Sequence, residues 1–271
     1  MSTILKVGSV GSEVAALQGL LNAAGHKVEV DGWFGRKTEQ AVRAFQASQL
    51  PPLVVDGRAG MQTMAALRGQ RQENMLDQTA IESAAAMLDV DVAAIMAVNQ
   101  VEARGRGFLN DGRVKILFER HIFYKLLKEK HGVAYADKIA ATSPHVCNKA
   151  RGGYKGGAAE YPRFSRAFYI DGEIAMMSCS WGAYQIMGFN HRAAGFKTVG
   201  EFVDTMKTSE NAHLIAFAEF IKADKNLHQA LKNRDWADFA RRYNGPDYRA
   251  NAYDTKLANA YVYFGGQVRA A

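Results

Sequence analysis

The spacing of apolar residues in the N-terminal part of the chain predicts three short helices. Ser12 is a candidate N-cap for the first helix, because a serine hydroxyl can satisfy free backbone N–H groups in a first turn. Gly25 suits the end of that helix, and Pro51-Pro52 ends the second. The apolar positions that define the three helices are Val14, Leu17, Leu20 and Leu21, then Ala41, Val42 and Phe45, then Met64, Ala65 and Leu67.

Two turns of one design connect these helices. The motif Val-Asp-Gly-x-x-Gly-x-x-Thr occurs at residues 30–38 and again at residues 55–63. Asp31-Gly32 and Asp56-Gly57 are the turn-forming pairs, since glycine supplies the positive φ that such turns need. The repeat therefore predicts a small module in which one turn is built twice.

The first module also carries a longer pattern, which reads Gly8-Ser9-x-Gly11-x-x-Val14-x-x-Leu17-Gln18-x-x-Leu21-Asn22 and then Asp31-Gly32-x-Phe34-Gly35-x-x-Thr38-x-x-Ala41-Val42-x-x-Phe45-Gln46. This pattern resembles the three-helix peptidoglycan-binding domain, which implies a role in holding the protein on the bacterial wall. Trp33 is the candidate wall contact, because an exposed aromatic ring beside a turn can stack on a sugar face. The alternative is that Phe34 packs in the core and that, of the two aromatic residues, only Trp33 is partly exposed.

A polar stretch without apolar periodicity follows the first module. It begins at Gly69 and predicts a linker over residues 70–77. The linker separates a small domain over residues 1–69 from a larger domain over residues 78–271.

The larger domain is predicted to be mostly helical. Thr79 to Leu88 is rich in alanine and forms one helix, and Asp91 caps a second that ends near Glu102. Arg104-Gly105-Arg106-Gly107 stops this second helix. The expected fold class is therefore mainly α, with a small three-helix domain before a larger helical one.

Glu102 is the candidate catalytic residue. Ile95, Val98 and Glu102 fall at i, i+3 and i+7, which places the carboxyl group on an apolar helix face. Partial desolvation and the nearby helix C-terminus both favour its protonated form, as a general acid requires. Arg104 and Arg106 act in the opposite direction if they pack close, and the alternative is that Glu102 simply pairs with one of them.

Two later segments combine small residues, aromatics and amides. The first spans residues 178–188 and the second residues 242–246, with tyrosines following at positions 248 and 253. Glycine and serine let a backbone approach a substrate closely, and the Gln185 amide can bridge sugar hydroxyls and amides. Each segment is a weak signal alone, since aromatics beside glycine often just pack.

Glu102, followed by Ser180-Trp181-Gly182-Ala183-Tyr184-Gln185-Ile186 and then by Tyr243-Asn244-Gly245, resembles the lysozyme-like superfamily, particularly goose-type lysozymes and lytic transglycosylases. Residues 101–109, 111–113 and 116–124 resemble the phage endolysin N-acetylmuramidases more closely. The resemblance implies cleavage of the β-1,4 bond between N-acetylmuramic acid and N-acetylglucosamine. It implies that Glu102 is the acid, with substrate-binding positions at Ser180, Gln185, Tyr243 and Asn244.

Such a reaction usually needs a second carboxylate. Glu119 is the nearest candidate, although an ion pair within Glu119-Arg120 is an equal alternative. Asp111 and Asp171 each precede a glycine and are expected to form turns. A third alternative is that the substrate's acetamido group or a positioned water takes the place of the second carboxylate.

Composition narrows the choice of partner. The formal net charge of +7 suits an anionic envelope, while no Lys/Arg-rich run or zinc-finger spacing predicts a nucleic-acid partner. Cys147 and Cys179 lack CxxC spacing, so we expect two buried thiols. The histidines lack the ligand spacing of a zinc amidase, so we expect no metal and no cofactor.

The expected function is therefore that of an endolysin, a monomeric peptidoglycan hydrolase that lyses the bacterial host at the end of a phage cycle. No signal peptide and no apolar stretch of about 18 residues is found. We expect synthesis in the host cytoplasm, release through a holin-type pore and action on the wall in the periplasm. The alternatives are a lytic transglycosylase, which forms 1,6-anhydro products, and a non-catalytic wall-binding or virion structural protein.

Overall fold

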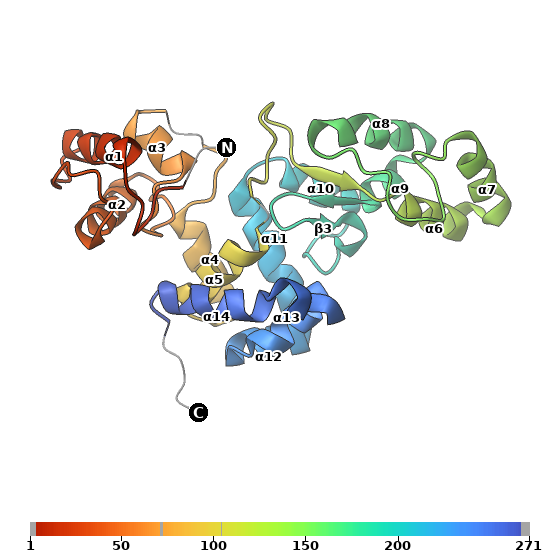
Figure 1. Ribbon diagram of the computed structural model, residues 1–271. Helices are drawn as coiled ribbons and strands as arrows, with labels where there is room; N and C mark the ends of the chain where they lie inside the picture. Colours follow the sequence, from red (N-terminus) through yellow and green to blue (C-terminus); the bar gives the residue numbers. More distant parts are fainter. Residues whose placement is uncertain (1–3, 71–72, 104, 267–271) are drawn as a thin grey trace. The chain divides into compact units, whose positions relative to one another are not determined.

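The computed structural model describes residues 4–70, 73–103 and 105–266, and these are mainly helical, as expected (Figure 1). The chain divides into two compact units, Met1–Ala85 and Ala86–Ala271, with the boundary inside helix α4 (Gln78–Leu88). The domain boundaries drawn from the sequence, with a linker over residues 70–77, stay predictions.

The first unit contains the three predicted helices, α1 (Ser12–Ala23), α2 (Arg36–Ser48) and α3 (Met61–Leu67). The prediction of Ser12 as the N-cap of α1 is wrong, because Gly11 occupies that position. The chain enters the helix with a φ of 117° at residue 11, which glycine tolerates and serine does not. The buried core residues of this unit are Leu5, Val14, Leu17, Leu21, Phe34, Ala41, Val42, Phe45, Leu53 and Ala59.

The first of the two repeated turns is held by a buried glutamine. The Nε2 atom of Gln18 donates to the Oδ1 atom of Asp31 at 2.7 Å and to the carbonyl of Trp33 at 3.1 Å. The Oε1 atom of Gln18 accepts from the backbone N–H of Gly32, and Thr38 donates to the Trp33 carbonyl. Asp31 is thus a turn former, as the motif predicts.

The second turn repeats these contacts with its own residues. Gln46 donates to the Oδ1 atom of Asp56 at 2.8 Å and to the carbonyl of Arg58 at 3.0 Å. Its Oε1 atom accepts from the N–H of Gly57, and Thr63 donates to the Arg58 carbonyl. The sequence repeat is therefore a repeat of hydrogen bonds, with a glutamine in each copy at its centre.

The second unit is a set of helices around one small sheet. The strands are β1 (Ile116–Phe118), β2 (Cys179–Trp181) and β3 (Ile186–Met187), in the order β1-β2-β3 and antiparallel throughout. Its helices, with 3-10 turns marked η, are α5 (Val92–Glu102), α6 (Arg120–His131), α7 (Val133–Thr142), η1 (Gly157–Ala159), α8 (Glu160–Ile170), α9 (Gly172–Met177), η2 (Gly188–Asn190), α10 (Val199–Met206), α11 (Glu210–Ala223), α12 (Lys225–Asn233), α13 (Trp236–Asn244), η3 (Pro246–Asn251) and α14 (Tyr253–Tyr263).

Helix α5 is the central helix that leads to the predicted site. Asp91 caps it as expected, accepting from the N–H of Ala94 at 2.8 Å. The same carboxylate accepts from Arg234 at 2.6 Å and from the hydroxyl of Tyr261 at 2.7 Å, so the start of α5 is tied to the helices packed around it (Figure 1). α5 ends at Glu102, and the Arg104 predicted to stop it lies outside the described residues.

Two further expectations concern the thiols and the membrane. Cys147 and Cys179 are both buried and free, as predicted. Burial raises the pKa of Cys147 to about 11, which makes it unreactive at neutral pH. Within the described ranges, no helix has the length and apolar character needed to cross a membrane.

Candidate active site

A cleft of about 550 Å³ opens in the second unit and gathers the predicted site residues. Glu102 reaches it from the end of α5, and Ser180 and Gln185 reach it from β2 and the turn that follows. Tyr243 and Asn244 come from the end of α13. The lining residues are Glu102, Lys115, Ile116, Leu117, Glu119, Gly156, Gly157, Ser180, Tyr184, Gln185, Ile186, Met187, Asn190, Phe220, Tyr243 and Asn244.

Glu102 is buried in the cleft wall, with 3% of its surface exposed. The side-chain amide of Asn244 donates to its Oε1 atom at 2.9 Å, across 142 residues of sequence. An amide donor fixes the carboxyl group without adding a positive charge. The alternative, in which Glu102 pairs with Arg104 or Arg106, stays a prediction, and Arg104 lies outside the described residues.

The side chain of Gln185 makes hydrogen bonds within the protein, in the wall of the cleft. Its Oε1 atom accepts from the hydroxyl of Ser180 at 2.9 Å, and its Nε2 atom donates to the carbonyl of Gly182 at 2.7 Å. These bonds close the turn between β2 and β3, where Gln185 has a φ of 52°. The amide therefore shapes the cleft, and its atoms already have partners in the protein.

Two tyrosines complete this wall. Tyr184 stacks on Phe217 with ring centroids 4.3 Å apart, and its hydroxyl donates to the Oδ1 atom of Asn99 at 2.6 Å. Burial raises the pKa of Tyr184 well above its usual value, so the phenol remains a donor. The hydroxyl of Tyr243 donates to the Tyr184 carbonyl at 3.2 Å, which ties α13 to the β2–β3 turn.

The three candidates for a second carboxylate lie in different places. Asp111 pairs with Arg113 at 2.6 Å, and that hydrogen bond lowers the pKa of Asp111. Asp171 caps α9 and pairs with Lys130 at 3.0 Å. Asp111 also accepts from the backbone N–H of Arg113 at 3.1 Å, as the predicted turn requires, whereas Asp171 begins a helix and does not form the predicted turn. Of the three, Glu119 alone lines the cleft that contains Glu102.

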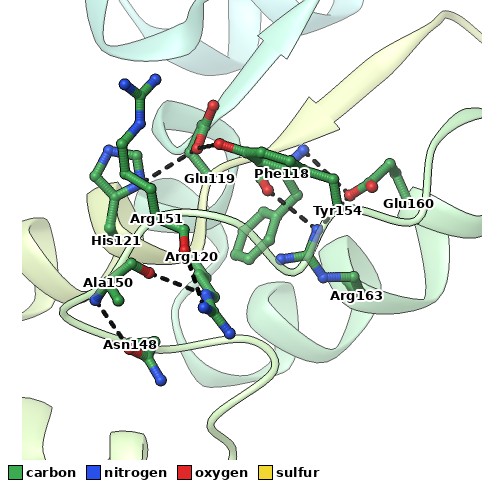
Figure 2. Close-up of polar contacts among 10 residues, drawn as sticks. All are labelled: Phe118, Glu119, Arg120, His121, Asn148, Ala150, Arg151, Tyr154, Glu160 and Arg163. Carbon is green, nitrogen blue, oxygen red and sulfur yellow. Dashed lines mark hydrogen bonds and ion pairs between the residues drawn. The ribbon is translucent and has the colours of Figure 1, made fainter.

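The predicted alternative for Glu119, an ion pair with Arg120, is wrong for the described residues. Glu119 accepts from the hydroxyl of Tyr154 at 2.8 Å and lies 3.2 Å from the Nδ1 atom of His121 (Figure 2). Arg120 turns the other way and donates to the backbone carbonyls of residues 144, 150 and 151. Adjacent residues at the start of a helix point in different directions, and this separates the two side chains.

The N-acetylmuramidase family model matches residues 91–265. The chain belongs to this family. A peptidoglycan binding domain model matches residues 10–67. The crystal structure of a Burkholderia AP3 phage endolysin superposes with a TM-score of 0.90 at 45% identity, over 97% of this chain and 99% of that one. No curated protein matches the chain.

These findings confirm the predicted pairing of a peptidoglycan-binding module with a muramidase module. They also confirm a peptidoglycan hydrolase of the endolysin type and a lysozyme-type glycoside hydrolase. The non-catalytic alternative is therefore not favoured. In the muramidase, no cluster of three or more His, Cys, Asp or Glu that could hold a metal is found among the described residues.

Several residues of the muramidase cleft were missed in the sequence. Lys115 immediately precedes β1, and Asn190 and Phe220 lie in η2 and α11. Gly156 directly precedes η1, and Gly157 is the first residue of η1. No motif marks these positions, because they approach Glu102 only through the packing of distant segments.

The predicted wall contact lies on the first unit. Trp33 is 60% exposed, whereas its neighbour Phe34 is fully buried. The backbone of Trp33 is fixed by the first repeated turn, where its N–H donates to Asp31 at 2.8 Å. The indole is thus held on a rigid turn and is open to a ligand.

Proposed function

We propose that Glu102 is the general acid of this muramidase and protonates the leaving oxygen of the β-1,4 bond between N-acetylmuramic acid and N-acetylglucosamine. The observation that supports this role is a buried carboxyl group, in a cleft, that is held by the neutral amide of Asn244. The amide orients the carboxyl group, and a general acid must be held within hydrogen-bond reach of the oxygen that it protonates.

Glu119 is the second carboxylate in this proposal. Glycoside hydrolysis uses a pair of carboxyl groups that flank the scissile bond, and Glu119 lines the same cleft as Glu102. It acts either as the nucleophile that forms a glycosyl-enzyme intermediate or as the base that takes a proton from water. The anomeric form of the first product distinguishes these roles, because the nucleophile retains the configuration and the base inverts it.

The remaining predicted residues orient the acid and shape the cleft. Asn244 holds Glu102 through its amide. Ser180, Gln185 and Tyr243 form a wall of fixed polar groups against which the sugar chain lies. A wall that is already ordered loses little conformational entropy when the substrate binds.

The first unit holds the enzyme on its substrate through Trp33, whose exposed indole stacks on a sugar face. The whole protein acts as a monomer on the wall in the periplasm and lyses the host. It reaches the wall from the cytoplasm through a holin-type pore. Nucleic acid is not a partner in this proposal.

A set of matched substitutions tests the choice of second carboxylate. Glu119→Gln is expected to lower the turnover of purified peptidoglycan by at least about 100-fold, because it removes the nucleophile or base. Asp111→Asn and Asp171→Asn, outside the cleft, are expected to retain turnover within about twofold when the protein is folded. A folded Glu119→Gln variant with full activity would remove Glu119 from the mechanism and favour the substrate's acetamido group or a water.

A further inference from the structure

The carboxylate of Glu119 is held on one of its two oxygens. Tyr154 donates to Oε2 at 2.8 Å and the Nδ1 atom of His121 lies 3.2 Å from the same oxygen (Figure 2). In the part of the chain that the structure describes, Oε1 has no such contact with another side chain. One oxygen is therefore fixed by the protein and the other is left for the cleft.

The position of Glu119 explains why its side chain needs this support. Glu119 is the N-cap residue of α6, yet its carboxylate makes no capping hydrogen bond. Its backbone is fixed, with the N–H donating to the carbonyl of Ser178 at 2.9 Å and the carbonyl accepting from Phe123 at 3.0 Å. The direction of the carboxylate thus depends on the hydrogen bond from Tyr154, since the Nδ1 atom of His121 makes no hydrogen bond with any described residue.

The loop that carries Tyr154 is attached to the residue after Glu119. The guanidinium of Arg120 donates to the carbonyls of Ala150 and Arg151, both at 3.0 Å (Figure 2). Gly153 has a φ of +77°, and a Cβ atom there would lie 3.1 Å from the Nη1 atom of Arg120. Glycine at this position lets the loop pass close to Arg120 just before Tyr154.

The other side of the loop is attached through the residue before Glu119. The carboxylate of Glu160 accepts from the backbone N–H groups of Lys155 and Gly156, at 2.5 and 2.8 Å. The N–H of Phe118 donates to the same carboxylate at 3.4 Å. The residues on both sides of Glu119 thus anchor the loop on both sides of Tyr154.

We propose that Tyr154 is a positioning residue, which holds the Oε2 atom of Glu119 so that Oε1 faces the reacting sugar. This inference rests on the proposed role of Glu119 as the second carboxylate. Partial desolvation of the phenol, together with the hydrogen bond to Glu119, raises the pKa of Tyr154, so the phenol stays protonated and keeps donating at neutral pH.

The test compares Tyr154→Phe with Tyr124→Phe in the full chain. Each substitution removes one hydroxyl, and each hydroxyl donates to a carboxylate at 2.8 Å, but the partner of Tyr124 is Asp137, which does not line the cleft. We expect Tyr154→Phe to lower kcat on soluble peptidoglycan fragments by about 10-fold, with KM within about twofold. Tyr124→Phe is expected to leave both constants near wild type.

Other outcomes would overturn the inference. A rise in KM with unchanged kcat would make Tyr154 a substrate contact, and a rise in KM with a fall in kcat would indicate a loosened loop, because Gly156 and Gly157 line the cleft. An unchanged kcat would remove the positioning role. Glu119→Gln, measured beside it, separates the two proposals: if that variant is inactive and Tyr154→Phe is fully active, only the inference about Tyr154 fails.

Discussion

Glu102 and Glu160 are both buried glutamates of the second unit, with exposed fractions of 3% and 0%, but they stand at opposite ends of their helices. Glu102 is the last residue of α5, where the helix dipole disfavours a negative charge. Glu160 is the first residue of α8, where the dipole favours one.

The side chains and backbone groups that contact these two carboxylates also differ. Glu160 pairs with the guanidinium of Arg163 at 2.5 Å (Figure 2). It also accepts from the backbone N–H of Gly156 at 2.8 Å. Glu102 accepts from the neutral amide of Asn244 and lines the cleft. Two glutamates of similar burial thus have different surroundings: Glu160 is part of a buried ion pair, whereas Glu102 lies in the cleft wall, where we propose that it acts as the acid.

The largest expected effect comes from removing the acid. Glu102→Gln should lower turnover of peptidoglycan by at least about 1,000-fold, because a glutamine cannot donate the proton that the leaving oxygen needs. Its amide oxygen can still accept from Asn244, so the thermal midpoint should stay close to that of the wild type. Glu129→Gln, at an exposed helix position, is the matched control and should retain full activity. Near wild-type activity in folded Glu102→Gln would show that Glu102 is not the acid.

For Glu160, the expected effect of the same substitution is a loss of stability. Glu160→Gln removes one partner of a buried ion pair, which costs about 3 to 5 kcal/mol of unfolding free energy. Urea unfolding followed by circular dichroism measures this loss. Equal unfolding free energies for Glu160→Gln and Glu102→Gln would mean that the two glutamates do not differ in structural role.

A third buried group of the second unit, His213, is expected to make the stability of the protein depend on pH. Burial lowers the pKa of His213 from 6.5 to about 4, although a hydrogen bond to the carbonyl of Met206 opposes the shift. The unfolded chain binds this proton below about pH 6.5 while the folded chain does not, so stability is lost as pH falls from about 6.5 to 4. The shift corresponds to about 3 kcal/mol.

Unfolding free energies measured between pH 4 and 7 test this dependence. An NMR titration of the His213 imidazole resonances shows whether His213 causes it. A His213 titration near pH 6.5 in the folded protein would contradict the expected loss. The Nδ1 atom of His213 accepts from the N–H of Ala183 at 3.3 Å, and Nε2 lies 2.6 Å from the Met206 carbonyl, as a neutral imidazole requires.

The parts of the molecule that rest on local contacts could be predicted from the sequence. The repeated turns can be predicted because Asp31 and Asp56 accept hydrogen bonds from backbone N–H groups within their own short motifs. Helix α5 is readable because Asp91 caps it and its apolar spacing leads to Glu102. The cap at Ser12 was wrong because the pattern carries no backbone angle, and the φ at Gly11 decides where α1 begins.

The partners within the site could not be predicted in the same way. Asn244 reaches Glu102 across 142 residues, and Tyr154 reaches Glu119 across 35, so no local spacing relates them. The resemblance to lysozyme-like enzymes supplied Asn244 as a position and did not supply its contact with Glu102. Lys115 and Phe220 line the cleft without any motif at all.

Hydrolysis of the sugar chain by this protein can be tested by mass spectrometry of the fragments that it releases from purified Gram-negative peptidoglycan. We expect fragments that end in reducing N-acetylmuramic acid, and their loss when Glu102→Gln is used in place of the wild type. Anhydro-muramic ends, lighter by one water, would contradict hydrolysis and make the enzyme a lytic transglycosylase. Freed stem peptides would contradict cleavage of the sugar chain, and the role of Glu102 with it.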